Sequence, residues 1–470
     1  MANTGPLNIG IIGAGVTGLS AAYDLLKAGH RVTVYEARPY AGGLAAGFKD
    51  EAWEWPLERF YHHIFAGDKD IIGLVDEIGI GDRLFFPSPV TSIYKDGRLY
   101  PINKPMFGPW LEKLPLGTQL ANLGDLAATA LRVLAFKPIP LLARFRVGLM
   151  TAYIRYGLRW QSLEQVTAHE WLSRAVGAKA YEAFWQPLLE GKFGEYYQQV
   201  NMAWFWARIV ARSPKLGYFV GGFQGFIDAL ADKVRVLGGD VRLNTHVRGI
   251  HPQADARADT GQIRLELRDE APLHDRVLAT CSPRMLRELT RLADQPTELP
   301  ASYTAGLDKL KSMGAVVMVM ALKQPVTPEH YWINIPKREG FPFLAFVEHT
   351  NYIDKQHYGG DNLIYCGDYL SPGHPYFDME PEALLETFVP AIQRLNPAFD
   401  RSWIRKYWKF SEIYAQPVPF LNHSQNIPPI QTPISNLYMA NMSQVYPWDR
   451  GTNYAVEIGR RAAKIVESKE

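Results

Sequence analysis

The sequence predicts an α/β fold in which one domain is assembled from separated parts of the chain. Three stretches predict it, each alternating between strand-like and helix-like patterns. Residues 8–47 run from an apolar strand through a glycine-rich turn into a helix and a second strand. Residues 216–247 place a helix and a glycine pair before a strand, and residues 436–466 end the chain with a strand and a helix. Strands alternating with helices in this way indicate a largely parallel sheet.

The first stretch carries glycines at G-x-G-x-x-G spacing, at Gly13, Gly15 and Gly18. The first glycine allows a tight turn after the strand, and the second allows the backbone to approach a pyrophosphate closely. The third allows the helix to pack closely against the strand. The helix N-terminus then offers free N–H groups to phosphates. Glu36, 18 residues past Gly18, can accept both ribose hydroxyls and disfavours a 2′-phosphate. A plain glycine-rich turn is the alternative, but the complete order of parts favours NAD or FAD.

A second glycine pair within Gly42-Gly43-Leu44 follows Glu36 and is preceded by Arg38. This arrangement resembles the extended N-terminal signature of FAD enzymes of the amine oxidase superfamily. That group includes monoamine oxidases, protoporphyrinogen oxidases, phytoene desaturases and, more distantly, UDP-galactopyranose mutase. The resemblance implies FAD and a Rossmann-type FAD-binding domain. Beyond the first three glycines and Glu36, it implies these cofactor contacts: Ala37, Arg38, Gly42, Gly43, Leu44, Val247, Asn441, Gly451, Thr452 and Asn453.

The later members of that set lie in segments that resemble the superfamily's internal and C-terminal motifs. Val247 has the position of the valine that packs against the adenine. Gly451-Thr452-Asn453 opens the last helix, whose N-terminus can stabilise negative charge at the flavin N1/C2=O edge. Ala440-Asn441-Met442 departs from the Ala-Gly-Asp of many members, although an asparagine can still hydrogen-bond without a charge.

We expect a discontinuous FAD-binding domain from residues 1–95, 216–300 and 405–470. Residues 96–215 are expected to form a helical insertion at the substrate entrance, with a helix over 162–177 that starts at Ser162. β-rich runs at 315–322, 343–347 and 362–369 predict an antiparallel sheet in a substrate-binding domain over 301–404, giving that part an α+β character.

Composition excludes several classes of function. The 470 residues carry a net charge of only +2, which gives no support to nucleic-acid binding. The two cysteines, Cys281 and Cys366, are far apart, so we expect no metal site or disulfide framework. The first strand starts about eight residues into the chain, so we expect no signal peptide. No apolar run is about 20 residues long, so we expect no transmembrane helix. We therefore expect a cytoplasmic protein.

Residues 107–160 differ from the rest of the chain because they are apolar, helical in spacing and basic. No acid lies between Asp125 and Glu164, where there are six bases. Apolar faces with basic edges suit an anionic membrane surface, so this segment predicts peripheral contact with the cytosolic face of a membrane. A helical domain with a basic solvated face is the alternative interpretation.

The aromatic segment 51–65 contains His62 and His63, and in the resembled family this segment passes beside the flavin ring. These two histidines are the candidate catalytic residues, of which we expect one at most to face the ring. Tyr61 from the same segment, and Gln416 from a segment similar to one that crosses near the substrate in protoporphyrinogen oxidases, are the candidate substrate contacts. The stretch 186–191, QPLLEG, resembles protoporphyrinogen oxidases as well.

The resemblance implies an FAD-dependent oxidase or desaturase. The flavin would take a hydride from a large, mostly apolar substrate, such as a tetrapyrrole or an isoprenoid, and oxygen or a quinone would reoxidise it. The alternative is a non-redox sugar-nucleotide mutase similar to UDP-galactopyranose mutase, which His63-Ile64-Phe65 resembles. A flavin-bound protein with only a binding or structural role is a third interpretation, because fold alone does not fix function.

Overall fold

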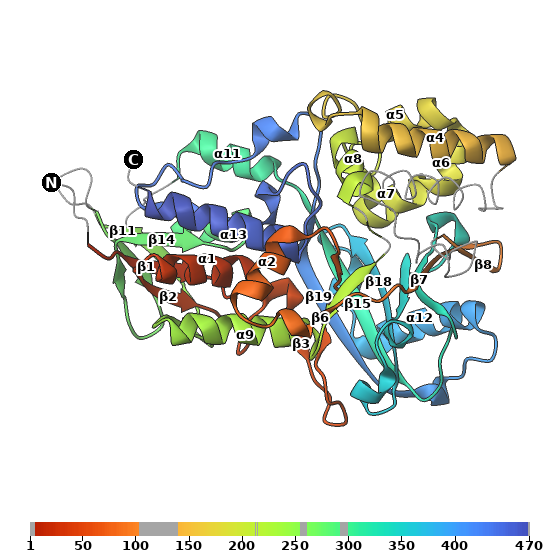
Figure 1. Ribbon diagram of the computed structural model, residues 1–470, viewed down its shortest axis with the longest axis horizontal. Coiled ribbons are helices and arrows are strands. Elements are labelled where there is room, and N and C mark those ends of the chain that lie inside the picture. The colour runs from red at the N-terminus through yellow and green to blue at the C-terminus, as the bar shows by residue number, and fades with distance from the viewer. Residues whose placement is uncertain are drawn as a thin grey trace.

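The computed structural model describes residues 5–102, 140–211, 213, 215–253, 261–291 and 299–468. Two halves of the molecule lie side by side (Figure 1). One is built on a five-stranded parallel sheet and the other on a seven-stranded mixed sheet. The predicted α/β fold class is confirmed at this level.

The parallel sheet has the strand order β10-β2-β1-β14-β20. Its strands are β1 (Asn8–Ile12), β2 (Arg31–Tyr35), β10 (Asp240–Arg242), β14 (Arg276–Ala279) and β20 (Leu437–Met439). Helices α1 (Val16–Lys27), α9 (Gly222–Val236) and α13 (Thr452–Glu467) pack around it (Figure 1). Ile9 and Ile11 of the central strand are fully buried, as in a parallel sheet covered on both faces. Its strands come from separated segments of the chain, as the sequence predicts.

The seven-stranded sheet has the order β19-β15-β18-β17-β16-β7-β8, antiparallel except for the pair β16–β7. Its strands are β7 (Val90–Lys95), β8 (Arg98–Pro101), β15 (Ser312–Leu322), β16 (His330–Asn334), β17 (Ala345–Glu348), β18 (Asn362–Leu370) and β19 (Ile404–Pro417). Helix α12 (Pro381–Leu395) lies beside this sheet and shares a core with it (Figure 1).

Two strands of this sheet cross the domain boundaries that the sequence predicts. β7 lies inside 1–95 and almost all of β19 inside 405–470, both assigned to the FAD-binding domain, yet neither joins the parallel sheet. β7 pairs instead with β16, where Ser92 faces Ile333. Alternation of apolar residues indicates a strand but does not identify its partner, which here lies more than 230 residues along the chain. Residues 90–95 and 404–417 therefore belong with the seven-stranded sheet.

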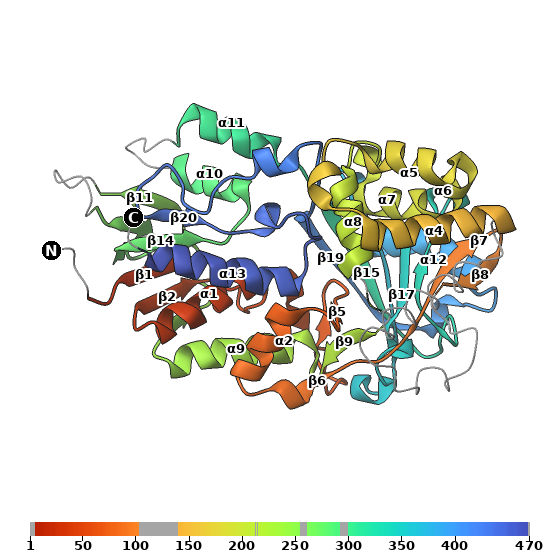
Figure 2. The same ribbon diagram turned by 45° about the horizontal axis from the view of Figure 1, so that its top comes forward.

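Five helices cover one end of the seven-stranded sheet (Figure 2). They are α4 (Leu141–Gly157), α5 (Ala168–Val176), α6 (Ala178–Phe184), α7 (Gln186–Phe193) and α8 (Met202–Ala211). The helix start predicted at Ser162 is wrong. Residues 160–162 form a 3-10 turn, and α5 begins after Thr167, whose hydroxyl accepts the Glu170 N–H at 3.1 Å. Thr167 and Glu170 have the same capping spacing, so the pattern occurs twice within a few residues.

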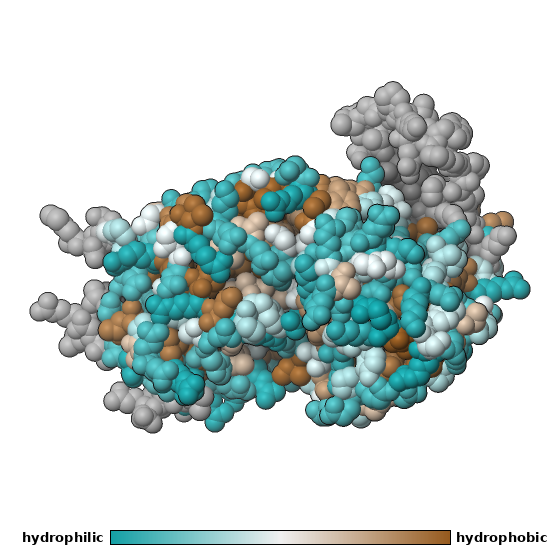
Figure 3. Space-filling view, turned by 90° about the horizontal axis from the view of Figure 1, so that it is seen from below, coloured by the Kyte–Doolittle hydropathy of each residue, from teal (hydrophilic) through white to brown (hydrophobic). Residues whose placement is uncertain are grey.

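The remaining elements connect or flank the two sheets. They are β3 (Gly47–Phe48), β4 (Leu57–Glu58), β5 (Ile64–Phe65), β6 (Leu84–Phe85), β9 (Leu216–Phe219), β11 (Gly249–Pro252), β12 (Ile263–Glu266), β13 (Leu273–His274), α2 (Lys69–Glu77), α10 (Pro283–Arg291) and α11 (Ala301–Lys309). One face of the molecule is mostly hydrophilic with separate hydrophobic patches (Figure 3). Within the described residues, no helix is long and apolar enough to cross a membrane.

Candidate active site

The glycine-rich turn leaves the carboxyl end of β1 and leads directly into α1. Gly13 has φ +105°, a conformation that favours glycine, and its N–H donates to the Tyr35 carbonyl at 2.8 Å. A Cβ on Gly18 would overlap the Gly13 carbonyl oxygen, so only glycine lets the first turn of α1 pack this closely. The local geometry therefore matches the roles that the spacing predicts for these two glycines.

The second glycine pair lies directly against this turn. Gly42 forms a parallel bridge with Gly15, and its N–H donates to the Ala14 carbonyl at 2.8 Å. A Cβ on Gly15 would lie 3.9 Å from Gly43 Cα, and one on Gly43 would lie 3.4 Å from Gly15 Cα. Side chains at either position would thus fill the space between the two loops. The first turn of α1 has no side-chain cap, so its N–H groups are not blocked by one.

Glu36 directly follows β2, beside the glycine-rich turn. Its carboxylate accepts the Ala14 N–H at 2.9 Å and the Arg38 N–H at 2.9 Å. Its backbone carbonyl accepts the Thr245 N–H at 2.8 Å, which brings the segment containing the buried Val247 to the same edge of the sheet. Ala37 and Arg38 are exposed there, and the Arg38 guanidinium pairs with Glu412 at 2.9 Å.

Several predicted cofactor residues of the C-terminal segment are engaged within the protein. The Asn441 amide oxygen accepts the Ser443 N–H and the Tyr414 hydroxyl, both at 3.0 Å, and its NH₂ group donates to the Cys281 carbonyl at 3.1 Å. Asn453 accepts two backbone N–H groups at the start of α2. Gly451 lies at the N-terminus of α13 and Thr452 is buried there; the helix has no side-chain cap.

A small cavity lies where the two halves meet. It is lined by Leu44, Phe60, Tyr61, His62, Ala315, Val317, Asp368, Tyr369, Ala415 and Arg450. Leu44 comes from the loop of the second glycine pair and Arg450 from the residue before Gly451, whereas Asp368 and Tyr369 come from β18. The cavity therefore lies between segments predicted to hold the cofactor and the seven-stranded sheet.

Of the two candidate histidines, His62 lines the cavity and His63 is not among its lining residues. The Nδ1 atom of His62 lies 2.5 Å from the Phe60 carbonyl oxygen, and burial lowers the pKa of its imidazole to about 4. A neutral ring at physiological pH would therefore donate from Nδ1 to that carbonyl. Tyr61 lines the same cavity, with its ring edge-on to Trp332 and Tyr365.

Asp368 is the one carboxylic acid among the residues that line the cavity. Its Oδ1 atom has no hydrogen-bond partner in the described part of the chain. Burial raises the pKa of this carboxyl to about 8, so it carries a proton at neutral pH. No sequence pattern points to this residue, because Asp368 stands alone inside a strand pattern.

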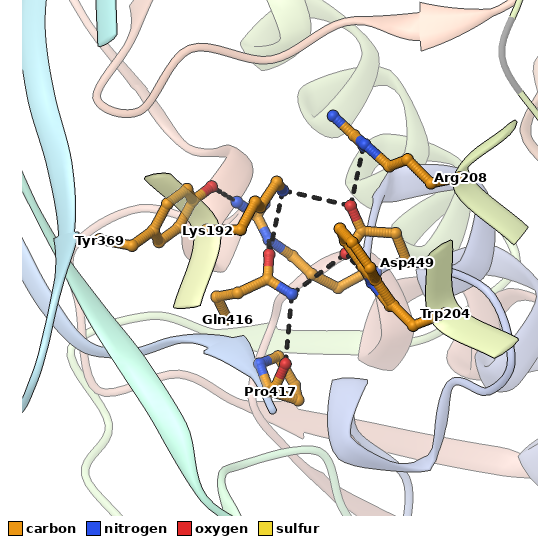
Figure 4. A network of polar contacts seen from close by, with 8 residues as sticks. Lys192, Trp204, Arg208, Tyr369, Gln416, Pro417 and Asp449 are labelled. Atoms are coloured by element: carbon orange, nitrogen blue, oxygen red, sulfur yellow. Dashed lines mark hydrogen bonds and ion pairs between the residues drawn. The ribbon is translucent and has the colours of Figure 1, made fainter. Parts of the chain in front are cut away.

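A cluster of charged side chains adjoins the cavity (Figure 4). Asp449 lies at its centre and accepts from Lys192 Nζ at 3.1 Å and Arg208 at 2.9 Å. The other carboxylate oxygen accepts from Trp204 Nε1 and Gln416 Nε2, both at 3.1 Å. We call Lys192, Arg208, Asp449 and Arg450, with the amide of Gln416, the Asp449 cluster.

Gln416, predicted as a substrate contact, is therefore placed in the Asp449 cluster, and its neighbour Ala415 lines the cavity. Sequence reasoning missed Lys192, Arg208, Asp449, Arg450 and Asp368. One signal was available: Asp449-Arg450 stands directly before the Gly451 that opens the last helix. Lys192 also directly follows the QPLLEG stretch, which resembles protoporphyrinogen oxidases.

Comparisons with known proteins agree with this geometry. A model of the family described as flavin containing amine oxidoreductase matches residues 16–466. A probable zeta-carotene desaturase from Synechococcus elongatus is 24% identical over 509 aligned positions, which cover 98% of this chain and 98% of that protein.

Two solved structures share the fold along almost the whole chain. A putative protoporphyrinogen oxidase from Exiguobacterium sp. 255-15 has a TM-score of 0.72 at 18% identity and covers 99% of both chains. Reduced UDP-galactopyranose mutase has a TM-score of 0.68 at 17% identity, over 98% of this chain and 95% of that one. At these identities the two structures show a common fold alone.

Proposed function

Because the chain belongs to the family of flavin-containing amine oxidoreductases and is a flavin-dependent oxidoreductase, we propose that its cofactor is FAD. We propose further that it takes a hydride from a large, mostly apolar substrate such as an isoprenoid or a tetrapyrrole. One observation carries this proposal: a single cavity is lined by Leu44 beside the glycine pair, by Arg450 before α13, and by side chains of the seven-stranded sheet.

The residues present fit a dinucleotide. Gly15 and Gly43 face each other with room that any side chain would fill, and the uncapped start of α1 offers N–H groups to a pyrophosphate. Glu36 lies at the end of the neighbouring strand, where its carboxylate would accept ribose hydroxyls. A nicotinamide dinucleotide would need no second glycine pair, so Gly42 and Gly43 support FAD.

The substrate side of the cavity is mostly apolar and aromatic. Phe60, Tyr61 and Val317 line it and would keep water away from the reacting atoms. When bound, the flavin supplies an acceptor for a hydride. The chain's own residues would orient the substrate: His62 is held by the Phe60 carbonyl, and Asp368 presents the free side of a carboxyl group.

The named relatives support an apolar substrate. The Synechococcus protein is named for a carotene, and the Exiguobacterium structure for protoporphyrinogen. Oxygen or a quinone is the acceptor that we propose for reoxidation, since these are the two acceptors that a substrate-reduced flavin commonly meets.

Anaerobic flavin bleaching tests the reaction. The purified protein with its flavin is mixed with ζ-carotene, phytoene or protoporphyrinogen in detergent, and the flavin absorption band is followed. We expect at least one of these substrates to bleach the band. The proposal fails if none does and if a UDP-sugar is converted only after reduction of the flavin by dithionite.

We also propose that helix α4 makes peripheral contact with an anionic membrane; residues 107–139 of the predicted membrane segment lie outside the described residues. Leu142, Phe145 and Leu149 lie on one face of α4, with exposed fractions of 77%, 64% and 63%. The helix contains arginines and no acidic residue, which suits an anionic lipid surface.

Liposome flotation tests this contact. The wild-type protein should float with vesicles that contain phosphatidylserine, and the Leu142→Glu/Phe145→Glu double variant should stay at the bottom. Val236→Glu is the control, because Val236 is 80% exposed on α9, away from this face. Equal flotation of the double variant and the wild type would contradict a role for α4.

A further inference from the structure

The Asp449 cluster holds more positive than negative charge. Three cations, Lys192, Arg208 and Arg450, surround one carboxylate. Only 14% of the Lys192 side chain is exposed, 18% of Arg208 and 10% of Asp449, so water compensates this charge poorly. The carboxylate of Asp449 keeps a pKa far below its ordinary value because these cations stabilise its charged form.

The other groups that face the cluster do not supply the missing negative charge. They are Tyr369 on β18, Gln416 on β19, Trp204 on α8, and the cavity residues Tyr61, His62 and Asp368. The tyrosines, the amide and the indole are neutral. Burial keeps His62 uncharged and Asp368 protonated near neutral pH. Within the described residues, the cluster therefore has an unmatched positive charge beside the cavity.

Arg450 is the member of the cluster that reaches the cavity. Its guanidinium contacts the Tyr369 hydroxyl, its Nε lies 3.4 Å from the Gln416 amide oxygen, and its backbone N–H donates to Asp449 at 3.1 Å. It directly precedes Gly451, at the N-terminus of α13, whose dipole has the same sign. A planar cation fixed in this way matches a flat, delocalised anion.

We propose that Arg450 stabilises the negative charge that the reduced flavin carries, and that Asp449 and Lys192 are positioning residues that hold Arg450 at the cavity. This inference rests on the proposed function, since it requires a flavin in the cavity. An anionic group of the substrate could supply the same charge, so the test must separate these two sources.

The test measures sulfite binding to the FAD-loaded, full-length protein. Sulfite adds to oxidised flavin and leaves a negative charge on its ring system, so its dissociation constant reports a nearby cation without any substrate. In Arg450→Met we expect sulfite to bind on the order of 10- to 100-fold more weakly. The two-electron potential should fall in parallel, by about 30 mV for each tenfold change. Arg450→Lys should retain most of the effect because it retains the charge.

Lys192→Met tests the positive charge of the cluster independently, in case Arg450→Met fails to fold. Burial lowers the pKa of Lys192 to about 7, so the cluster loses one positive charge as the pH rises through that value. The ratio of the sulfite dissociation constants of Lys192→Met and wild type should therefore be largest at pH 6 and decrease by pH 8. The ionisation of sulfite itself cancels in this ratio. Asp368→Asn in both backgrounds removes the other group that titrates in this range.

The outcomes separate the hypotheses. If the wild-type protein does not retain FAD, the proposed function and this inference both fail. If FAD is retained but Arg450→Met binds sulfite within twofold of wild type at an unchanged potential, the inference alone is overturned. Benzoate serves as a model for an anionic substrate group. If sulfite binding and the potential are unchanged in Arg450→Met while benzoate perturbs the flavin spectrum of the wild type and not of the variant, the anion belongs to the substrate, which also overturns the proposal as stated.

Discussion

Glu58 should make the protein less stable as the pH rises, and replacing it by glutamine should remove that dependence. The carboxyl group is 1% exposed and accepts the Phe223 N–H at 2.8 Å and the Tyr218 hydroxyl at about 2.9–3.0 Å. Burial nevertheless raises its pKa from 4.5 to about 7, because the desolvation of the charged form outweighs these hydrogen bonds. Glutamine has nearly the same shape and can still accept from Phe223.

The sign follows from proton linkage. Between pH 4.5 and 7 the folded state keeps the proton of Glu58 while the unfolded state has lost it. The stability that this group contributes is therefore complete below pH 4.5 and is lost as the pH rises through 7. For these two pKa values, the contribution of Glu58 to the free energy of unfolding falls by about 0.8 kcal/mol by pH 5 and by about 3.3 kcal/mol by pH 8.

Urea unfolding of wild type and Glu58→Gln, followed by tryptophan fluorescence at pH 5 and pH 8, measures the effect. We compare the free energy of unfolding of the variant minus that of the wild type at the two pH values. This difference should be about 2.5 kcal/mol larger at pH 8 than at pH 5. Other titrating groups, such as the buried His349, cancel in this double difference. An identical relative stability at both pH values would refute the assignment of a raised pKa to Glu58.

Three further predictions concern the cofactor turn and an ion pair at the edge of the seven-stranded sheet. Gly18→Ala should lower the melting temperature and leave the purified protein without flavin, because a Cβ overlaps the Gly13 carbonyl oxygen; Gly73→Ala, with open space around its Cβ, is the control and should retain flavin. Glu36→Ala should weaken FAD retention on gel filtration, and an unchanged flavin content would exclude its ribose role. Asp361→Asn should lower the free energy of unfolding by about 1–3 kcal/mol in a urea titration. In that variant Arg405 loses the charge of Asp361, whose carboxylate accepts from its Nε at 2.9 Å, and keeps Asp50 as its other acidic partner. A change below about 0.3 kcal/mol would contradict this account.

Patterns of neighbouring residues in the sequence were sufficient to predict the strands and the glycine-rich turn of the parallel sheet. The turn after β1, the start of α1 and the end of β2 each follow from residues within about 30 positions, since glycine conformations and strand ends are decided by near neighbours. The strand runs at 315–322 and 362–369 also lie within β15 and β18. Periodicity and turn chemistry are properties of neighbouring residues, so they indicate such elements without knowledge of tertiary contacts.

Long-range pairing could not be predicted from those signals. β7 pairs with β16 and so leaves the half of the molecule to which its position in the chain assigned it. The same limit applies to the Asp449 cluster, where Lys192 meets an aspartate 257 residues further on. A lone lysine on a helix is usually a solvated residue, and only the tertiary structure shows that α7 turns this one inward.

The end of β19 divides its side chains between the cavity and the Asp449 cluster, which the resemblance of this segment alone does not indicate. Successive side chains of a strand point to opposite faces, so Ala415 and Gln416 cannot both face the cavity. Ala415 lines it, and Gln416 points into the Asp449 cluster, where its oxygen accepts from Lys192 at 3.1 Å and its NH₂ group donates to Asp449. One strand end thus forms the wall of the cavity with one face and supports Arg450 with the other. Under the proposed function, Gln416 and Tyr369 would thus connect the wall of the cavity to the charge of Arg450, so that a change in this wall would alter the electrostatics of the proposed flavin site.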